Sequence, residues 1–347
     1  MKKAVIIGCG FAGVSATQQL SKFRHALELT IIDKNPYFNF LPCLPDVIGR
    51  NIRPASLRYP IKLLSQNRRF NFIEDQVKSI DLGNNTVFTS GQNIAYDYLI
   101  IASGTETNFY GNSEIKQYAY KLDDAEDARL IRDTLDENDF DYYVISGAGY
   151  TGIEIATALR VYLNKKSKNK PIVIVEKSNG ILGPLPDWIK NYTWDNLKRL
   201  NIRVIPNTAI VKVEKTKITL SNQDAFDNAM LIWTAGVKTP DFVQNLSVDK
   251  TPQGRLKVDE YLRIRDNCFA VGDSAYFTYN NSFLRLAVQF AITQGASTGA
   301  NIISSIQGRN LEPYQPLDLG YIIPMANNKS CGHVLGINVQ GLLPTFL

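Results

Sequence analysis

Two copies of one glycine spacing constrain the fold of this chain more than any other feature. The first copy spans residues 8–13 and reads GCGFAG, and the second spans residues 147–152 and reads GAGYTG. Each copy follows an apolar run of strand character, residues 4–7 or 142–145, and opens a stretch of helical character. The spacing therefore predicts two strand–loop–helix units in an α/β fold.

An acidic residue closes the next apolar run in each unit: Asp33 in the first and Glu176 in the second. In a dinucleotide-binding unit the glycines permit a sharp turn, close approach to a pyrophosphate and tight helix–strand packing. The acid accepts hydrogen bonds from the ribose hydroxyls of adenosine, and it would repel a 2′-phosphate, so Glu176 favours NADH over NADPH. One motif alone could be an ordinary glycine turn, but two complete units predict two bound dinucleotides.

The composition is that of an ordinary globular protein with 347 residues, 44% apolar and 20% charged, which is enough for two or three domains. A net charge of +5 does not indicate a nucleic-acid partner, and it does not oppose contact with an anionic membrane surface. No apolar run approaches the roughly 18 residues of a membrane span. We expect a cytoplasmic protein, either soluble or peripheral at the cytoplasmic face of the membrane.

Four cysteines and two histidines are scattered along the chain without a metal-ligand spacing or a Cys-x-x-Cys pair. We therefore predict no metal site and little material for histidine-based catalysis. A bound redox cofactor is expected to supply the chemistry.

The repeat extends beyond the glycine motifs. The apolar strand 98–102 ends in Ser103-Gly104, and a matching strand in the second unit ends shortly before Gly236. Between the first acid and strand 98–102 we predict a hairpin that joins residues 70–73 to residues 86–88 through a turn at Asn84-Asn85.

Through these motifs the whole chain resembles the two-dinucleotide flavoproteins of the pyridine nucleotide–disulfide reductase family, and within it the type II NADH dehydrogenases (NADH:quinone oxidoreductases). Further matches are Ala102-Ser103-Gly104, Trp233 to Val237, Phe269 to Asp273, and Gln289-Phe290-Ala291 with Gly295. The resemblance implies an α/β fold with two Rossmann-like domains, for FAD and NAD, the second inserted in the first, and a short C-terminal segment. The expected boundaries are 1–115 and 240–312 for the FAD domain, 116–239 for the NAD domain, and 313–347 for the C-terminal segment.

The resemblance also implies the residues that hold the cofactors FAD and NADH. In the segments assigned to the FAD domain they are Gly8, Gly10, Phe11, Ala12, Gly13, Asp33, Lys34, Pro42, Ser103, Gly104, Gly272, Asp273 and Gln289. In the NAD domain they are Gly147, Gly149, Tyr150, Thr151, Gly152, Glu176 and Gly236. Asp273 would hold the ribityl chain of FAD, although Gly272-Asp273 alone is also compatible with an ordinary turn at a strand end.

Three residues are predicted to act in catalysis: Glu154, Gln289 and Thr293. Glu154 matches a glutamate near the nicotinamide in the family, and its alternative role is charge complementarity at a helix N-terminus. Relatives line a quinone site with Ala-Gln-x-Ala-x-Gln, where residues 288–293 here read VQFAIT and Gln294 follows. The implied reaction is hydride transfer from NADH to flavin, followed by two electrons to a small-molecule acceptor, which we predict to be a quinone. Gln289 could instead pair with backbone.

The same residues are also compatible with three other functions. Sulfide:quinone reductases need a cysteine pair, and Cys331 falls near one position of that pair while residues 100–145 contain no cysteine. Cys43 falls near the redox thiol of single-cysteine NADH oxidases and disulfide reductases, or it is a small buried hydrophobic residue. A flavin-binding sensor without turnover is a third option. Relatives usually carry a C-terminal tail that rests on the membrane; here the sequence ends soon after Cys331, so membrane contact and a homodimer both stay open.

Overall fold

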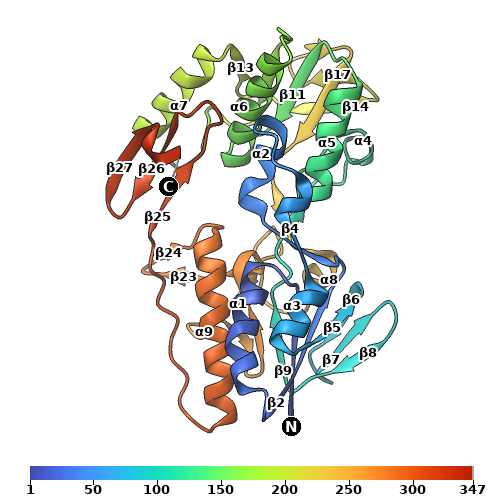
Figure 1. The fold of residues 1–347 in the computed structure, drawn as a ribbon, viewed down its shortest axis with the longest axis vertical. Coiled ribbons are helices and arrows are strands. Elements are labelled where there is room, and N and C mark those ends of the chain that lie inside the picture. Colours follow the sequence, from blue (N-terminus) through green and yellow to red (C-terminus); the bar gives the residue numbers. More distant parts are fainter. Residues whose placement is uncertain (346–347) are drawn as a thin grey trace. The chain divides into compact units, whose positions relative to one another are not determined.

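The computed structural model describes residues 1–345 and forms two compact units (Figure 1). The first unit consists of Met1–Asn39, Tyr59–Glu106 and Val237–Asp318. The second consists of Phe40–Arg58, Thr107–Gly236 and the described residues from Leu319 onward. Each unit is described by itself below.

The first unit is built on a six-stranded sheet in the order β20-β21-β9-β1-β2-β5. Its strands are β20 (Arg263–Arg265), β21 (Cys268–Ala270), β9 (Tyr98–Ile101), β1 (Lys2–Ile7), β2 (Leu27–Asp33) and β5 (Asn71–Glu74). All neighbours pair in parallel except β20 with β21. Both faces of the sheet are covered, which explains why its inner strands β1, β2, β9 and β21 are mostly apolar and buried.

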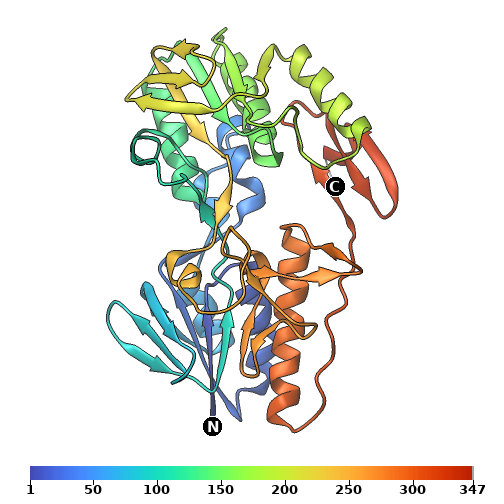
Figure 2. The same ribbon diagram turned by 180° about the vertical axis from the view of Figure 1, so that it is seen from behind.

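Three helices cover one face of this sheet: α1 (Phe11–Leu20), α3 (Ile61–Arg68) and α9 (Val288–Ile306). Of these, α1 and α9 lie side by side in both views of the ribbon (Figures 1 and 2). Their contact depends on small residues, because a Cβ atom on Gly295 would clash with the carbonyl oxygen of Ala12, and one on Gly299 would lie 3.0 Å from that of Ala16. The opposite face packs on the three-stranded sheet β6 (Val77–Asp81), β7 (Thr86–Thr89) and β8 (Asn93–Ala95) and on α8 (Asp241–Gln244).

The predicted hairpin is wrong in its first strand. Residues 71–74 form β5, which pairs in parallel with β2, so that Phe72 lies beside Ile31. The hairpin joins β6 to β7 instead, in the register Asp81 to Thr86. The carboxylate of Asp81 accepts hydrogen bonds from the N–H groups of Gly83 and Asn84, and this fixes the turn.

The second unit repeats the first in shorter form. Its parallel sheet has the order β13-β12-β11-β17, made of β13 (Ile202–Ile205), β12 (Ile172–Val175), β11 (Tyr142–Ser146) and β17 (Ala229–Trp233). The helices of its central stretch are α4 (Ser113–Tyr118), α5 (Ala125–Glu137), α6 (Tyr150–Lys165) and α7 (Asp187–Arg199). Its antiparallel sheet is β14 (Ile210–Glu214), β15 (Lys217–Leu220) and β16 (Ala225–Phe226). In the order of neighbouring strands, β17-β11-β12-β13 corresponds to β9-β1-β2-β5. The predicted α/β fold with two Rossmann-like units is confirmed.

Two segments join the second unit from outside its central stretch. The first, Phe40–Arg58, carries α2 (Leu44–Gly49), which packs so closely on α6 that a Cβ atom on Gly49 would lie 2.8 Å from the Cα atom of Ala158. Lys165 donates to the carbonyl of Gly49 at 2.9 Å and Arg132 to that of Ile48 at 3.1 Å, so cations stabilise the C-terminus of α2. We expected this segment in the first part of the FAD domain; its apolar contacts lie in the second unit.

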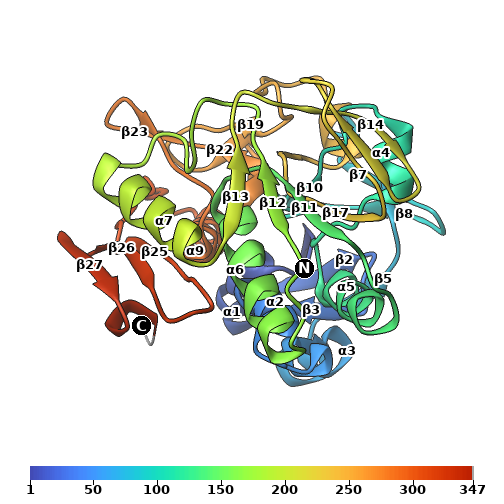
Figure 3. The same cartoon turned by 90° about the horizontal axis from the view of Figure 1, so that it is seen from above.

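The second such segment forms an antiparallel sheet of β25 (Gly320–Ile323), β26 (Ser330–Val334) and β27 (Ile337–Gly341). It lies against α7 (Figure 3), where the Sγ atom of Cys331 is 3.6 Å from the hydroxyl of Thr193. The last two residues of the expected C-terminal segment, 346 and 347, lie outside the described residues. None of the helices in residues 1–345 is long and apolar enough to cross a membrane.

Candidate functional site

The first glycine loop has two crowded glycines and one open one. Gly8 follows β1 with φ 100°, and a Cβ atom there would clash with the carbonyl of Ala102. A Cβ atom on Gly13 would clash with the carbonyl of Gly8. Gly10, which precedes α1 with φ −80°, has no atom within 4 Å of its Cβ position, and no side chain caps the helix N-terminus. The loop is therefore tight on the protein side and open on the side where a pyrophosphate would approach.

The second loop repeats this geometry almost residue for residue. Gly147 has φ 103° and lies against Thr234 and Ala235, which follow β17. A Cβ atom on Gly152 would clash with the carbonyl of Gly147, whereas the Cβ position of Gly149 is open. Gly149 precedes α6 with φ −78°, again without a side-chain cap. The residues present in both loops therefore fit a dinucleotide.

The two acids hold the loops in place. Asp33 accepts a hydrogen bond from the N–H of Cys9 at 2.7 Å and another from Asn35 at 2.9 Å. Glu176 accepts the equivalent bond from the N–H of Ala148 at 2.7 Å and one from Ser178 at 2.8 Å. Burial raises the pKa of Asp33, and the backbone hydrogen bonds oppose that shift. Asp33 ends β2 and Glu176 follows β12. Both carboxylates thus lie where the acid of a dinucleotide-binding unit accepts hydrogen bonds from the adenosine ribose.

Two more segments meet the first loop at the carboxyl edge of its sheet. The hydroxyl of Ser103, after β9, lies 3.1 Å from that of Ser274, which also donates to the carbonyl of Gly104 at 3.3 Å. Gly272, after β21, has φ 63°, and a Cβ atom there would lie 3.2 Å from the side chain of Ala12. The predicted residues of β1, β9, β21 and α1 are therefore neighbours.

A small pocket lies beside Gly272. Its lining includes Arg255, Asp273, Phe290 and Gln294. Burial raises the pKa of the Asp273 carboxyl, and the neighbouring Arg255 opposes that rise. Gln294 is 3% exposed, and its side-chain oxygen accepts the N–H of Gly272 at 2.7 Å. Gln294 is not among the predicted site residues. The signal that could have found it is a glutamine directly after the altered 288–293 motif.

Gln289 and Thr293 lie one turn apart on α9 and have other partners. The side-chain amide of Gln289 donates to Asp318 at 3.3 Å, and Arg285 pairs with the same carboxylate. The hydroxyl of Thr293 is 2.7 Å from that of Tyr314 and donates to the carbonyl of Gln289 at 2.9 Å. Gln289 thus hydrogen-bonds to Asp318, and Thr293 lies within hydrogen-bond distance of Tyr314.

The remaining predicted residues of the FAD set are less constrained. Phe11 opens α1, and its ring packs edge-on against Phe38 at 5.1 Å. Lys34 is exposed directly after Asp33. Pro42 is exposed in a short 3₁₀ turn, Leu41–Cys43, which belongs to the second unit.

Glu154 lies on α6, two residues after the second glycine loop. Burial, with a smaller contribution from the carboxylate of Asp46 on α2, raises its pKa to about 8. Asp46 is itself paired with Arg50 at 3.4 Å. Burial and the nearby carboxylates of Asp46 and Glu154 also raise the pKa of the Cys43 thiol. A carboxyl group that keeps its proton at neutral pH can donate a hydrogen bond, which an ordinary glutamate cannot.

The remaining residues that were predicted to bind NADH lie around the second glycine loop. Tyr150 opens α6, with its ring 6.1 Å from that of Tyr321, and Thr151 is exposed in the same turn. Gly236 follows β17 with φ 93°. These residues belong to one unit and lie at the carboxyl ends of its strands.

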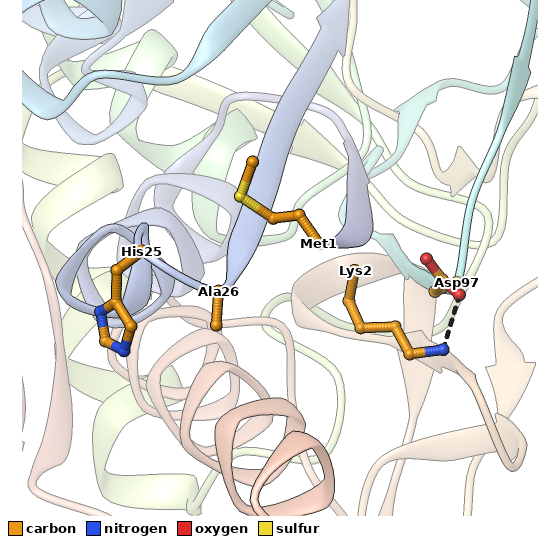
Figure 4. A pocket seen from close by; sticks show the side chains of 5 residues that line it. All are labelled: Met1, Lys2, His25, Ala26 and Asp97. Carbon is orange, nitrogen blue, oxygen red and sulfur yellow. Dashed lines mark hydrogen bonds and ion pairs between the residues drawn. The ribbon is translucent and has the colours of Figure 1, made fainter.

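A separate surface depression is lined by Met1, Lys2, His25, Ala26 and Asp97 (Figure 4). It contains an ion pair between Lys2 and Asp97 at 2.9 Å. It lies at the amino end of β1, whereas ligands of parallel α/β sheets bind at the carboxyl ends. We therefore exclude it as the dinucleotide site. Within residues 1–345, no three His, Cys, Asp or Glu side chains are grouped as a metal site requires.

Residues 2–297 match the model of the pyridine nucleotide-disulphide oxidoreductase family. The chain belongs to this family. The predicted membership is thereby confirmed, and with it the expectation of a flavin- and pyridine-nucleotide-dependent oxidoreductase.

Similar proteins within the family include several that are named as quinone oxidoreductases. The chain is 24% identical to a type II NADH:quinone oxidoreductase of Staphylococcus saprophyticus, across 100% of this chain and 93% of that protein. It is 26% identical to the external alternative NAD(P)H-ubiquinone oxidoreductase B3 of Arabidopsis thaliana mitochondria, across 79% of this chain and 54% of that protein. Its fold is similar to that of NDH2 from Plasmodium falciparum, solved in complex with NADH, with a TM-score of 0.86 and 19% identity over 98% of this chain and 91% of that one.

Proposed function

We propose that this protein is an FAD-dependent oxidoreductase that takes a hydride from NADH and passes two electrons to a quinone. The observation that carries the proposal is the pair of glycine loops with matching backbone geometry, each held by its own acid. Relatives across the whole chain are named for oxidation of NADH by a quinone.

The two units would divide the cofactors. In the first, Gly8, Gly10 and Gly13 with the N-terminus of α1 would hold the pyrophosphate of FAD, Asp33 its ribose and Asp273 its ribityl chain. In the second, the loop from Gly147 to Gly152 would hold NADH, with Glu176 on the adenosine ribose. FAD, when bound, supplies the two-electron redox chemistry. The protein contributes position and electrostatics, and Glu154 contributes a protonated carboxyl group at neutral pH.

Gln289 tests the acceptor side of the proposal. We predict that Gln289→Ala lowers quinone reduction at least fivefold and leaves NADH-driven bleaching of the flavin intact, because it removes an amide from the acceptor side only. The two half-reactions are measured separately by stopped-flow absorbance. Gln307→Ala, an exposed change at the C-terminus of the same helix, is the control. Equal loss in both half-reactions would place Gln289 outside the acceptor site.

A screen of acceptors separates this proposal from the alternatives. NADH-reduced protein is mixed with menadione, short-chain ubiquinone, coenzyme A disulfide or oxygen, and the return of flavin absorbance is timed. The proposal predicts that a quinone is the fastest acceptor. Fastest reaction with the disulfide would favour single-cysteine chemistry, and no bleaching by NADH within minutes would favour a sensor.

The cysteines give little support to thiol chemistry. All four are free, and Cys9, Cys268 and Cys331 are buried. Cys43 is half-buried with a raised pKa, so it carries less of the reactive thiolate than an ordinary cysteine. Cys43→Ser should therefore leave quinone turnover within twofold of wild type; a collapse of turnover would revive the thiol mechanism.

Contact with a membrane surface belongs to the same proposal. Residues 319–345 contain no Asp or Glu, and several large apolar side chains there are exposed, among them Leu335 (71%), Ile337 (66%) and Leu343 (69%). An apolar surface without carboxylates suits an anionic bilayer. Co-sedimentation with vesicles of anionic phospholipid should fall in Ile337→Asn, and equal sedimentation of both proteins would contradict this. The cytoplasmic face as the location, and a homodimer, stay predictions.

A further inference from the structure

Tyr110 has a backbone conformation that its side chain disfavours. Tyr110 and Gly111 have φ 50° and 76°, and the N–H of Asn112 donates to the carbonyl of Phe109 at 2.9 Å. Two successive positive φ values closed by this bond are the pattern of a type I′ turn, whose first central position favours Asn, Asp or Gly. Tyr110 is the one aromatic residue with positive φ among residues 1–345.

The turn is fastened to the end of β17. The indole N–H of Trp233 donates to the carbonyl of Asn108 at 2.9 Å, and the N–H of Asn108 donates to Gly236 at 3.1 Å. The side chain of Asn108 also accepts the N–H of Tyr110 at 2.8 Å, and the ring of Phe109 stacks on Trp233 at 6.5 Å. The strained residue is therefore held in a fixed place beside the loop that follows β17.

The side chain of Tyr110 combines exposure with a specific contact. It is 67% exposed, yet its hydroxyl lies directly over Gly236, where a Cβ atom would clash with it. Packing therefore does not explain the tyrosine, since most of the ring is outside the core. Backbone strain that the surrounding structure holds in place is typical of functional positions.

The order of the strands indicates which part of a dinucleotide would meet this ring. In the order β12-β11-β17, Glu176 at the end of β12 would read the adenosine ribose and the glycine loop after β11 would hold the pyrophosphate. The other half of the dinucleotide then extends over the end of β17, where Gly236 and Tyr110 lie. We propose that Tyr110 contacts the nicotinamide half of NADH and helps to fix its position. The inference rests on the proposed function, because it needs a pyridine nucleotide in the second unit.

The test uses Tyr110→Asn in the full-length protein, because asparagine suits the turn and should keep or raise the melting temperature. Calorimetry with NAD⁺ and with ADP then separates the two halves of the ligand without redox chemistry. We expect the Kd of NAD⁺ to rise at least fivefold and that of ADP to change less than twofold. The control is Leu335→Asn, since Leu335 and Gly336 form the same left-handed pair, φ 49° and 84°, in the turn between β26 and β27.

The control should keep or raise the melting temperature without changing either Kd. An unchanged Kd of NAD⁺ in Tyr110→Asn would overturn the inference, and so would an equal rise for both ligands, because the change would then act on the loop. A wild-type protein that binds neither NAD⁺ nor ADP would overturn the proposed function itself.

Discussion

At the scale of single residues, two acidic side chains of different length each accept a hydrogen bond from the backbone of a glycine loop. Asp33 and Glu176 each accept the N–H of the residue after the first glycine of the loop, both at 2.7 Å. The glycine spacing predicts these positions from the sequence because it reflects local backbone geometry. Gln294, Asp46 and Tyr110 could not be found in the same way, since their significance depends on partners that only the tertiary fold brings close.

The selectivity for NADH should depend on Glu176. Glu176→Ala removes the acceptor for the ribose hydroxyls and the negative charge that opposes a 2′-phosphate. Losing charge-assisted hydrogen bonds of about 1.5–3 kcal/mol lowers kcat/KM for NADH roughly ten- to a hundredfold. The ratio of kcat/KM for NADH to that for NADPH should fall, and an unchanged ratio would contradict this role.

The raised pKa of Glu154 predicts a stability that depends on pH. Its pKa is raised from 4.5 to about 8, so the folded protein binds this proton more tightly than the unfolded chain does. Stability from this group is therefore lost as pH rises between those two values. The melting temperature of Glu154→Gln should gain on that of wild type from pH 5 to pH 8. Glu137→Gln, at an exposed site on α5, should show no such trend, and parallel curves for Glu154→Gln would contradict the shift.

At the scale of elements, the contact between α1 and α9 depends on the absence of side chains. Gly295→Ala should lower the free energy of unfolding by about 1–3 kcal/mol, because the new methyl group meets the carbonyl of Ala12. Alanine is otherwise the better helix former by about 1 kcal/mol, so any net loss reports packing. Ala300→Ser, exposed on the same helix, should change stability by less than about 0.5 kcal/mol in urea unfolding. A Gly295→Ala protein as stable as wild type would contradict the claim that the packing of α1 on α9 depends on this glycine.

Element assignment from the sequence succeeded where patterns are local and failed where pairing is remote. The run at residues 70–73 is short and mostly apolar. Nothing in it distinguishes a parallel partner far along the chain from a nearby antiparallel one. The turn at Asn84-Asn85 was predicted correctly, because turn chemistry is local: Asp81 binds the N–H groups of the turn itself.

At the scale of the whole molecule, the repeated unit explains the fold. The strand order β9-β1-β2-β5 returns as β17-β11-β12-β13. In both units a three-stranded antiparallel sheet comes just before the last of these strands in the chain, between β5 and β9 or between β13 and β17. The sequence predicts this repeat, since both copies keep their glycines and acid. It does not predict that α2 packs on α6, because the apolar side chains of α2 do not specify which unit they cover.

The most direct test of the central claim is anaerobic stopped-flow spectroscopy of the purified protein with its natural flavin content measured. The account predicts about one FAD per chain, bleaching of its absorbance by NADH and return of the colour on addition of menadione. A colourless protein that takes up no added FAD would contradict it, and so would a yellow protein that NADH fails to bleach.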